Sequence, residues 1–417
     1  MRRMTLPHSR SLALLLLVAS VSQSGCDPAQ VGAIARSDIP MEVPAAVGSQ
    51  SPNLAVGPDG TLVLSWIEPE ASGHALRYSI LEDANWSEPG SVARGDNWFV
   101  NWADFPSVVP VSDSLWAAHW LVRQPAGGYA YDVVLSISPD GGMTWEDAVK
   151  PHDDGTPTEH GFVSLFPYDS GLGLVWLDGR NMARQSPPGG PLSGMTLRSA
   201  TYSEELQIAN EKTVDELVCD CCQTDVALTA RGAIAVYRDR TVNETRDIYA
   251  AQFANGAWHP GYPVAADGWK IGGCPVNGPA VDADGDEVAV AWFTAADDEP
   301  KVRVARSADS GDTFSAPVDV TDSDIFGRAG VAMLGDGDVA VSWLCKENRN
   351  RARVCLRRVS ANGNAGPVQM LSGDEDVPPL SLPQLARVGS ALVAAWTVRG
   401  HNGSQIRSSR LAIDSLP

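Results

Sequence analysis

Ser138-Pro-Asp-Gly-Gly-Met-Thr-Trp145 and Ser307-Ala-Asp-Ser-Gly-Asp-Thr-Phe314 fit one eight-residue pattern, S-x-D-x-G-x-T-[WF]. Each follows a short run that is typical of a β-strand. Asp and Gly favour a tight turn, and Asp, Ser and Thr side chains can hydrogen-bond to its backbone. The final aromatic is expected to pack under neighbouring strands. Two copies at equivalent places predict a repeated β-structure.

A longer repeat supports this prediction, because seven apolar runs each end in an aromatic residue. These residues lie 51 to 61 positions apart. A period near 50 with four short strands per unit is typical of a propeller blade. The sequence therefore predicts an all-β chain that folds as a β-propeller. The aromatic residues are Trp66, Trp120, Trp176, Tyr237, Trp292, Trp343 and Trp396.

The eight-residue pattern resembles the Asp box of the sialidase (BNR-repeat) superfamily. This resemblance implies a β-propeller in which the boxes mark the fold and carry no catalysis. Sialidases usually have six blades, whereas the aromatic-ended runs predict seven four-stranded blades, with six as the alternative. Cys219–Thr224 and the string Tyr237-Arg238-Asp239 also resemble bacterial envelope proteins described as sialidase-like, whose reaction is undefined.

The two ends of the propeller are expected to meet. The seventh unit ends after its third strand, near Ile413, and Met41–Val47 precedes the first strand of unit one. Met41–Val47 is therefore predicted to form the outer strand of the blade that contains Leu392–Trp396. This pairing would close the ring and remove an exposed sheet edge.

The amino terminus has the features of an export signal. Arg2 and Arg3 precede the apolar run Leu12–Val21, which is too short to span a membrane as a helix. Cys26 follows Ser24-Gly25 and resembles a bacterial lipobox cysteine; ordinary signal cleavage is the alternative. We expect residues 1–26 to be a signal peptide, 27–40 a tether and 41–417 the propeller. The protein would then lie in the bacterial cell envelope, held to the membrane only by a lipid on Cys26.

The negative net charge of the chain bears on which class of macromolecule it can bind. The chain has a formal net charge of −20 at pH 7, whereas nucleic-acid binding requires basic surfaces. Nucleic acid is therefore excluded as a partner, and protein partners are left open.

Chemically specific residues gather on one predicted face. In a propeller, the loops between blades and the loops between second and third strands open on the same side, and such loops commonly carry function. We predict that six of the residues on these loops converge on a central funnel. They are Asp178, Arg180, Arg238, Asp239, Arg246 and Arg328.

The sialidase resemblance implies an arginine clamp for a carboxylate, an acid and a tyrosine nucleophile. Candidate acids are Asp178, Asp239 and Glu159, and Tyr237 or Tyr131 is the candidate nucleophile. Arg-Asp pairs in these loops could instead be structural salt bridges. The sequence departs from the family because its Arg-Ile-Pro-like string lies at 36–40 in the tether, and no late tyrosine stands where the nucleophile belongs. Candidate substrate-binding residues are Arg180, Arg238, Arg240, Arg246, Asp247, Arg328, His160, Trp102 and Asp104.

Six cysteines remain besides Cys26, and disulfides are the default in an oxidising compartment. Cys345 and Cys355 bracket a strand-turn-strand and are predicted to pair. Cys274 is predicted to pair with Cys221 or Cys222, preferably Cys222. The alternative is a copper or zinc site made by Cys219, Cys221, Cys222 and Cys274, with His160 as a further ligand.

These observations predict a propeller that recognises an anionic or polar glycan, with hydrolysis left open. The alternative is a non-catalytic binding or assembly propeller, linked to a metal through its cysteines. No cofactor other than that metal is expected.

Overall fold

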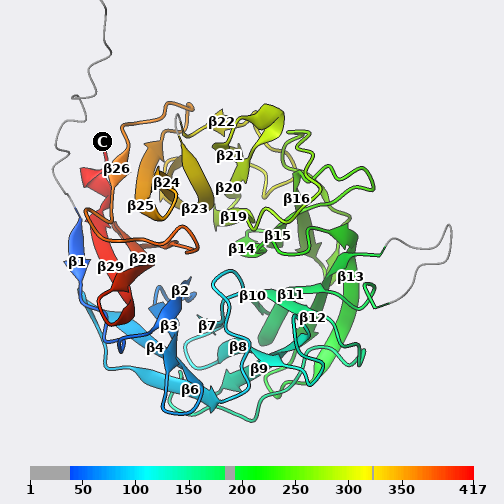
Figure 1. Ribbon diagram of the computed structural model, residues 1–417. Helices are drawn as coiled ribbons and strands as arrows, with labels where there is room; N and C mark the ends of the chain where they lie inside the picture. Colours follow the sequence, from blue (N-terminus) through cyan, green and yellow to red (C-terminus); the bar gives the residue numbers. More distant parts are fainter. Residues whose placement is uncertain (1–37, 184–192, 322–323) are drawn as a thin grey trace, which may run out of the picture. The chain divides into compact units, whose positions relative to one another are not determined.

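The structure is a computed structural model that describes residues 38–183, 193–321 and 324–417. Within the unit Arg36–Pro417 the described strands form seven antiparallel sheets arranged around a central channel (Figure 1). This confirms the predicted seven-bladed β-propeller and excludes six blades. The predicted signal peptide, the predicted lipidation site Cys26 and most of the predicted tether lie outside the described residues. Among the described residues no helix has the length and apolar character needed to cross a bilayer.

The first three blades follow chain order. Blade 1 contains β2 (Gln50–Val56), β3 (Leu62–Pro69), β4 (His74–Glu82), β5 (Asn85–Trp86) and β6 (Gly90–Gly95). Blade 2 contains β7 (Ser107–Pro110), β8 (Trp116–Arg123) and β9 (Tyr131–Ser138). Blade 3 contains β10 (His160–Tyr168), β11 (Gly171–Asp178), β12 (Met195–Tyr202) and β13 (Ile208–Val218).

The next two blades continue the ring. Blade 4 contains β14 (Asp225–Thr229), β15 (Gly232–Arg238), β16 (Ile248–Ala254), β17 (Ala257–Trp258) and β18 (Tyr262–Pro263). Blade 5 contains β19 (Ala280–Asp284), β20 (Glu287–Thr294), the 3-10 turn η1 (Ala296–Asp298), β21 (Lys301–Ser307) and β22 (Val318–Asp319).

The last two blades complete it. Blade 6 contains β23 (Ile325–Gly335), β24 (Asp338–Asn348), β25 (Arg351–Val359) and β26 (Gln369–Met370). Blade 7 contains β27 (Gln384–Val388), β28 (Ala391–Gly400), β29 (Gly403–Ala412) and the N-terminal β1 (Ile39–Met41), and the 3-10 turn η2 (Ile413–Ser415) follows it.

The core of this unit is a ring of apolar clusters, each shared by two neighbouring blades. The repeated aromatic residue of each second strand fills these interfaces. Five of these tryptophans are among the largest fully buried side chains, and each contributes on the order of 1.5–3 kcal/mol by burial. They are Trp66, Trp176, Trp292, Trp343 and Trp396.

The N-terminal strand closes the ring, although its bounds differ from the prediction. Strand β1 pairs with β29, where Met41 lies opposite Ser408. The Trp86 indole N–H donates to the Ser408 hydroxyl (2.8 Å), which donates to the Met41 carbonyl (3.1 Å). The strand covers 39–41 rather than 41–47. Pro44 explains the difference, because it lacks an N–H and fixes its own φ.

The two eight-residue stretches form the predicted turns, between the third strands of blades 2 and 5 and the chain that follows. In the first, the Thr144 backbone N–H and hydroxyl both donate to the Asp140 carboxylate, and the Gly142 N–H donates to the Ser138 hydroxyl (2.8 Å). Asp309 and Thr313 repeat this bonding in the second. Trp145 and Phe314 pack, half-buried, against the neighbouring apolar clusters.

Candidate functional site

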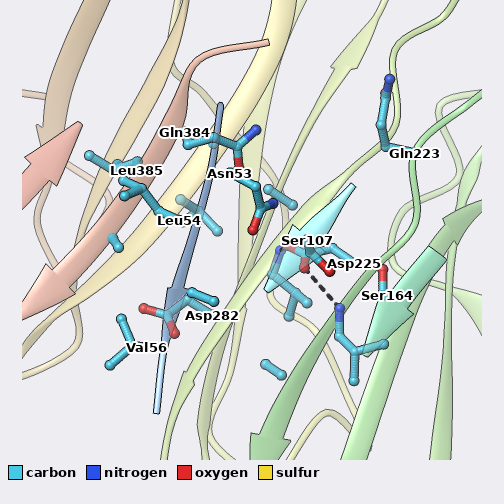
Figure 2. A pocket seen from close by; sticks show the side chains of 18 of the residues that line it. Asn53, Leu54, Val56, Ser107, Ser164, Gln223, Asp225, Asp282, Gln384 and Leu385 are labelled. Atoms are coloured by element: carbon cyan, nitrogen blue, oxygen red, sulfur yellow. Dashed lines mark hydrogen bonds between the residues drawn. The ribbon is translucent and has the colours of Figure 1, made fainter. Parts of the chain in front are cut away.

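The first strands of the seven blades line a central channel of about 590 Å³. Its wall carries amide, hydroxyl and carboxyl groups beside small apolar ones (Figure 2). We call the end at which the connections between blades enter these strands the loop face. The labelled polar residues of the wall are Asn53, Ser107, Ser164, Gln223, Asp225, Asp282 and Gln384.

The carboxyl groups of the wall connect the blades. Asp225 accepts the backbone N–H of Val281 from the next blade (2.8 Å), and Asp282 accepts that of Met333 (2.7 Å). Burial raises the pKa of Asp225 to about 7 and that of Asp282 to about 6. These side chains are engaged by the scaffold. The amide of Asn53, by contrast, forms no side-chain hydrogen bond with any described residue and can bind a ligand.

Three connections between blades meet at the loop-face end of the channel. The Gln223 amide donates to the Ala103 carbonyl (2.7 Å) and accepts the Gly278 N–H (3.2 Å). The Arg328 guanidinium lies over the Trp102 ring, with its carbon 4.8 Å from the ring centroid. Trp102 lies in the connection that leads into blade 2, and Arg328 lies near the start of the first strand of blade 6. We call the loop-face end of the channel, where these two side chains meet, the mouth.

Arg328 is a buried cation without a carboxylate partner. It is 8% exposed, lines the channel and forms no ion pair with a described residue. One guanidinium nitrogen donates to the Val276 carbonyl, whereas its Nε is buried without a partner. Its backbone φ is +63°, a conformation that is rare outside glycine and frequent at functional sites.

Burial lowers the pKa of Arg328 to about 10, so the guanidinium stays charged at neutral pH. A buried positive charge with a free N–H favours an anion beside it. Arg328 is therefore a buried cation on the channel wall whose charge no described carboxylate balances.

A second group of side chains lies beside this mouth. The Tyr131 hydroxyl is hydrogen-bonded to Asp104 (2.7 Å) and to Glu159 (2.8 Å). Tyr131 is fully buried and stacks on Phe99, and Asp104 also accepts the Phe162 backbone N–H (2.8 Å). Burial raises the pKa of Asp104 and that of Glu159 to about 7 each. Burial and the two neighbouring carboxylates also raise the pKa of Tyr131 well above its ordinary value. Glu159, which is half-buried, can supply a proton near neutral pH.

We expect a pH effect that depends on Glu159. Its folded pKa of about 7 exceeds its unfolded value of about 4.5. The folded state therefore binds the Glu159 proton more tightly than the unfolded state does. This proton stabilises the fold fully below pH 4.5, and the stabilisation is lost as pH rises through 7. From pH 5 to 8 the wild type should lose about 1 kcal/mol or more relative to Glu159→Gln, since each pKa unit corresponds to about 1.4 kcal/mol. Urea denaturation at both pH values measures this, and parallel losses in the two proteins would contradict it.

Asp178 and Arg180 belong to a separate group between blades 2 and 3. Asp178 is fully buried and accepts two hydrogen bonds from the Arg180 side chain (both 2.7 Å) and one from the Trp176 indole (2.9 Å). His160 lies beside Asp178, with 3.9 Å between Nε2 and Oδ1. Burial acts to raise the pKa of Asp178, but the Arg180 hydrogen bonds and nearby positive charges outweigh it and lower the pKa. This pair is a salt bridge within the fold.

Arg238 is part of the scaffold. It is 2% exposed and donates to the carbonyls of Asn277 (3.0 Å), Arg246 (2.6 Å) and Phe293 (2.6 Å). Its guanidinium also lies over the Trp269 ring (4.9 Å), and burial lowers its pKa to about 9. All of its donors serve the fold, so it presents nothing to a ligand.

The neighbouring arginines are paired with carboxylates. Arg240 binds Asp220 (3.1 Å) and Glu244 (2.7 Å). Arg246 is 2% exposed, pairs with Glu244 (2.9 Å) and donates to Cys219 Sγ (3.4 Å). These contacts neutralise both guanidinium groups.

The remaining candidate acids and the nucleophile of blade 4 are also enclosed. The Tyr237 hydroxyl donates to Asp215 (2.8 Å) and is 1% exposed. Asp247 accepts the backbone N–H groups of Gly268 and Trp269 (both 3.1 Å). Burial raises the pKa of Asp239 to about 7 and raises that of Tyr237 strongly. In this arrangement Tyr237 does not reach a surface where a sugar could be attacked.

The six residues predicted to converge on the channel do not form one cluster. Arg328 lines the channel, whereas the Asp178–Arg180 pair and the Arg238, Asp239 and Arg246 group lie elsewhere. The physical reason is local: Arg180, Arg238 and Arg246 find carboxylate or carbonyl acceptors within their own blade or the next, whereas Arg328 finds one carbonyl and no described carboxylate. The repeat placed the residues on the correct loops but could not give their side-chain partners.

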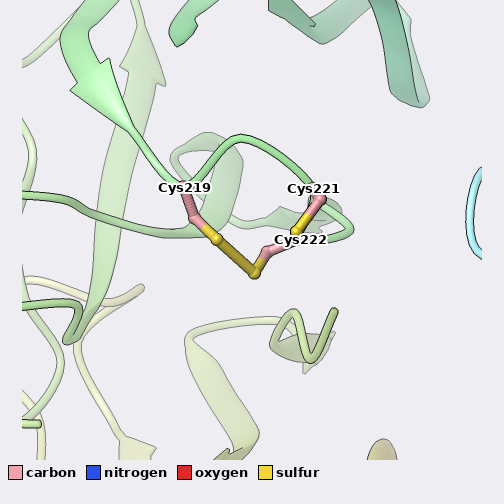
Figure 3. A group of neighbouring side chains, drawn as sticks. All are labelled: Cys219, Cys221 and Cys222. Atoms are coloured by element: carbon pink, nitrogen blue, oxygen red, sulfur yellow. A yellow bond between two sulfur atoms is a disulfide. The ribbon is translucent and has the colours of Figure 1, made fainter. Parts of the chain in front are cut away.

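The cysteines form three disulfides: Cys219–Cys222, Cys221–Cys274 and Cys345–Cys355. Cys345–Cys355 confirms the prediction. Cys274 pairs with Cys221, one of its two predicted partners, across a Cα separation of 6.1 Å, whereas the preferred Cys222–Cys274 pairing is wrong. Adjacent side chains diverge here, and Cys222, 2% exposed, faces Cys219 (Figure 3). Disulfide sulfurs are not thiolates, so these cysteines do not fit the copper or zinc alternative.

Removing the Cys345–Cys355 bridge with paired alanines should lower the free energy of unfolding by about 2–3 kcal/mol, because it closes a short loop. The strands already pair around it, so the fold should survive. Guanidinium denaturation measures the loss, and non-reduced peptide mapping should recover all three linkages. A loss below 0.5 kcal/mol, or Cys222 linked to Cys274, would contradict this account.

Sequence reasoning assigned no role to three contributors to the site, Asn53, His152 and Asp132. Asn53 was overlooked because an amide in a first strand gives no signal of facing a channel. His152, in the connection between β9 and β10, and Asp132, in β9, were not assigned as partners of His160, although the short separation of His152 from His160 was a usable signal.

No protein-family model and no curated protein matches this sequence. Among solved structures, the BP39L lectin from Burkholderia pseudomallei is 11% identical, with a TM-score of 0.59 over 87% of this chain and 96% of that chain. A PL25 ulvan lyase bound to -[GlcA(1-4)Rha3S]- is 12% identical, with a TM-score of 0.55 over 90% and 96%. The Hadza microbial sialidase Hz136 is 12% identical, with a TM-score of 0.43 over 71% and 63%. At these identities the likeness extends to the fold, and this chain is a seven-bladed β-propeller.

Proposed function

We propose that this protein is a glycan-binding propeller whose ligand enters the channel from the loop face and places a carboxylate against Arg328. One observation carries the proposal: Arg328 is a buried, charged guanidinium at a polar mouth, with a free Nε and no carboxylate among the described residues. Carboxylate is the group whose geometry matches a guanidinium best.

The surroundings of Arg328 suit a sugar. Trp102 offers an aromatic face at the mouth, and the Asn53 amide offers a donor and an acceptor on the wall. Sugars bind through such combinations of apolar faces and hydrogen-bonding groups. Two structural neighbours with a TM-score above 0.5 are a lectin and a polysaccharide lyase, and GlcA in the ligand of that lyase is a carboxylate-bearing sugar. These likenesses support a glycan as the ligand class.

The charge of the protein limits how acidic the ligand can be. With a net charge of −20, the propeller repels a densely charged polyanion at long range. The proposed ligand therefore carries a single carboxylate at the sugar that contacts Arg328.

Binding to immobilised glycans tests this function. Wild-type protein should be retained on uronate-containing oligosaccharides and much less on neutral ones of equal length. If no glycan in a panel of neutral and acidic oligosaccharides retains the protein, the proposed function is wrong.

Hydrolysis is a second candidate, favoured by one feature, the half-buried Glu159 with its raised pKa. General acids of glycosidases have such values. Incubation with bound oligosaccharides should then release reducing ends, and Glu159→Gln should abolish this. Binding without release would leave a lectin-like role.

We also propose that the protein is exported and anchored through Cys26. Cys26→Ala should move it from the membrane fraction to the soluble fraction of the envelope. Unchanged fractionation would contradict the lipid anchor.

A further inference from the structure

A cluster of two histidines and three carboxylates lies between blades 2 and 3. The His152 and His160 rings stack, with centroids 3.8 Å apart and planes inclined by 5°. Both are buried, at 7% and 0% exposure, and Asp132 beside them is 6% exposed. Asp132 belongs to β9, His152 to the connection after it and His160 to the start of β10.

One carboxylate oxygen lies beside both rings. Asp154 Oδ2 lies 3.0 Å from His160 Nε2 and 3.2 Å from His152 Nδ1. An ionised carboxylate only accepts hydrogen bonds, so His160 Nε2 donates to it, and His160 Nδ1 then carries a lone pair in the neutral ring. His152 Nε2 carries a lone pair when the proton of that ring is on Nδ1, the nitrogen that faces Asp154.

Those lone pairs face other acceptors. Asp132 Oδ1 lies 3.7 Å from His152 Nε2 and 3.9 Å from His160 Nδ1, and one ligand atom of each of the three residues lies within 4.8 Å of the other two. The carbonyls of Tyr131 and Thr158 are both 3.2 Å from His160 Nδ1. His152 Nε2 is buried and has no hydrogen-bond partner among the described residues.

A proton alone does not satisfy this arrangement. If it sat on His160 Nδ1, the two carbonyls would be bonded, but His152 Nε2 would still lack a partner. A metal ion between the three atoms would bind all of them. Ligand atoms in a tetrahedral zinc site are roughly 3.4 Å apart when each is about 2.1 Å from the metal. An imidazole nitrogen binds a metal along its in-plane lone pair, so the two parallel rings must tilt toward a shared point for this set to close on an ion.

We infer that His152 Nε2, His160 Nδ1 and Asp132 Oδ1 bind a divalent metal ion of the zinc class that joins blade 2 to blade 3. Two imidazoles and one carboxylate are borderline ligands that suit Zn²⁺. Asp154 is the carboxylate behind both histidines that orients metal-bound imidazoles. Lys150 pairs with the other Asp132 oxygen, Oδ2 (2.5 Å), and Gln124 Nε2 donates to Oδ1 (2.5 Å), which keeps a second lone pair for an ion. This site is separate from the cysteines and from Arg328.

Zinc binding tests this inference directly. Untagged protein with intact disulfides is treated with chelator, dialysed against Zn²⁺ and analysed by mass spectrometry for metal content. We expect one zinc per chain, and at least a tenfold weaker zinc affinity in His152→Gln and Asp132→Asn. His259→Gln, at an exposed histidine, is the matched control and should bind zinc like the wild type.

Two further readouts keep the test decisive. Zinc should raise the melting temperature of the wild type and of His259→Gln but not of the other two variants. X-ray absorption should show only nitrogen and oxygen ligands. Asp132→Asn has the same shape as the wild type, so it decides the matter if His152→Gln does not fold. Failure of the wild type to bind stoichiometric zinc, retention of zinc by both variants, or sulfur in the metal shell would overturn the inference.

Discussion

Replacing Arg328 by glutamine should weaken the binding of a carboxylate-bearing oligosaccharide about 100-fold. A hydrogen bond to a charged group contributes about 1.5–3 kcal/mol, and each 1.4 kcal/mol is a factor of ten. The free energy of unfolding should fall by no more than about 3 kcal/mol, because Arg328 forms no ion pair with a described carboxylate and its side chain only contacts the Trp102 ring and donates one hydrogen bond to the Val276 carbonyl. Isothermal titration calorimetry and urea denaturation measure the two effects.

Arg387→Gln is the control for this variant. Arg387 also lines the channel, at the end opposite the loop face, so the substitution removes the same charge. Its glycan affinity should match the wild type. Equal losses in the two variants would mean that general charge, rather than the position of Arg328, governs binding.

Replacing Arg238 by methionine should lower the free energy of unfolding by about 3–5 kcal/mol, the largest stability effect that we expect. Methionine fills much of the volume but leaves three buried carbonyls, those of Asn277, Arg246 and Phe293, without the donors they now have. Each unsatisfied buried group costs about 1–3 kcal/mol. Thermal and urea denaturation measure the loss.

The exposed ion pair between Arg94 and Glu70 provides the comparison. Arg94→Gln should change stability by less than about 1 kcal/mol, as is usual for surface pairs. An Arg238→Met protein as stable as Arg94→Gln would show that the carbonyl contacts of Arg238 contribute little.

The fold was predictable from the sequence because its signals repeat. An aromatic residue near the end of the second strand of each blade, such as Trp176 or Trp292, is buried at the interface with a neighbouring blade. The spacing of these residues along the chain therefore gives the length of one blade. The closure by the N-terminal strand followed from the missing last strand. Its bounds did not, because Pro44 ends the pairing after Met41.

The site was predictable only to the level of its loops. Nothing in the sequence distinguishes Arg238 from Arg328. In the fold, however, Arg238 donates to three carbonyls, whereas Arg328 donates to one and pairs with no described carboxylate. The partners of both come from distant connections, which the sequence does not place. The choice between Cys221 and Cys222 likewise depended on which side chain faces Cys274. The sequence showed His152 and His160 in one connection, but their stacking on a shared Asp154 requires three-dimensional placement.

Calorimetric titration with a trisaccharide that carries one uronate and with its carboxyl-reduced counterpart, on both the wild type and Arg328→Gln, tests the central claim most directly. The two sugars differ only in the group that Arg328 is proposed to bind. The account predicts that the wild type binds the uronate form at least tenfold more tightly and that Arg328→Gln binds both forms equally. Equal affinities in the wild type, or a preference that persists in Arg328→Gln, would contradict it.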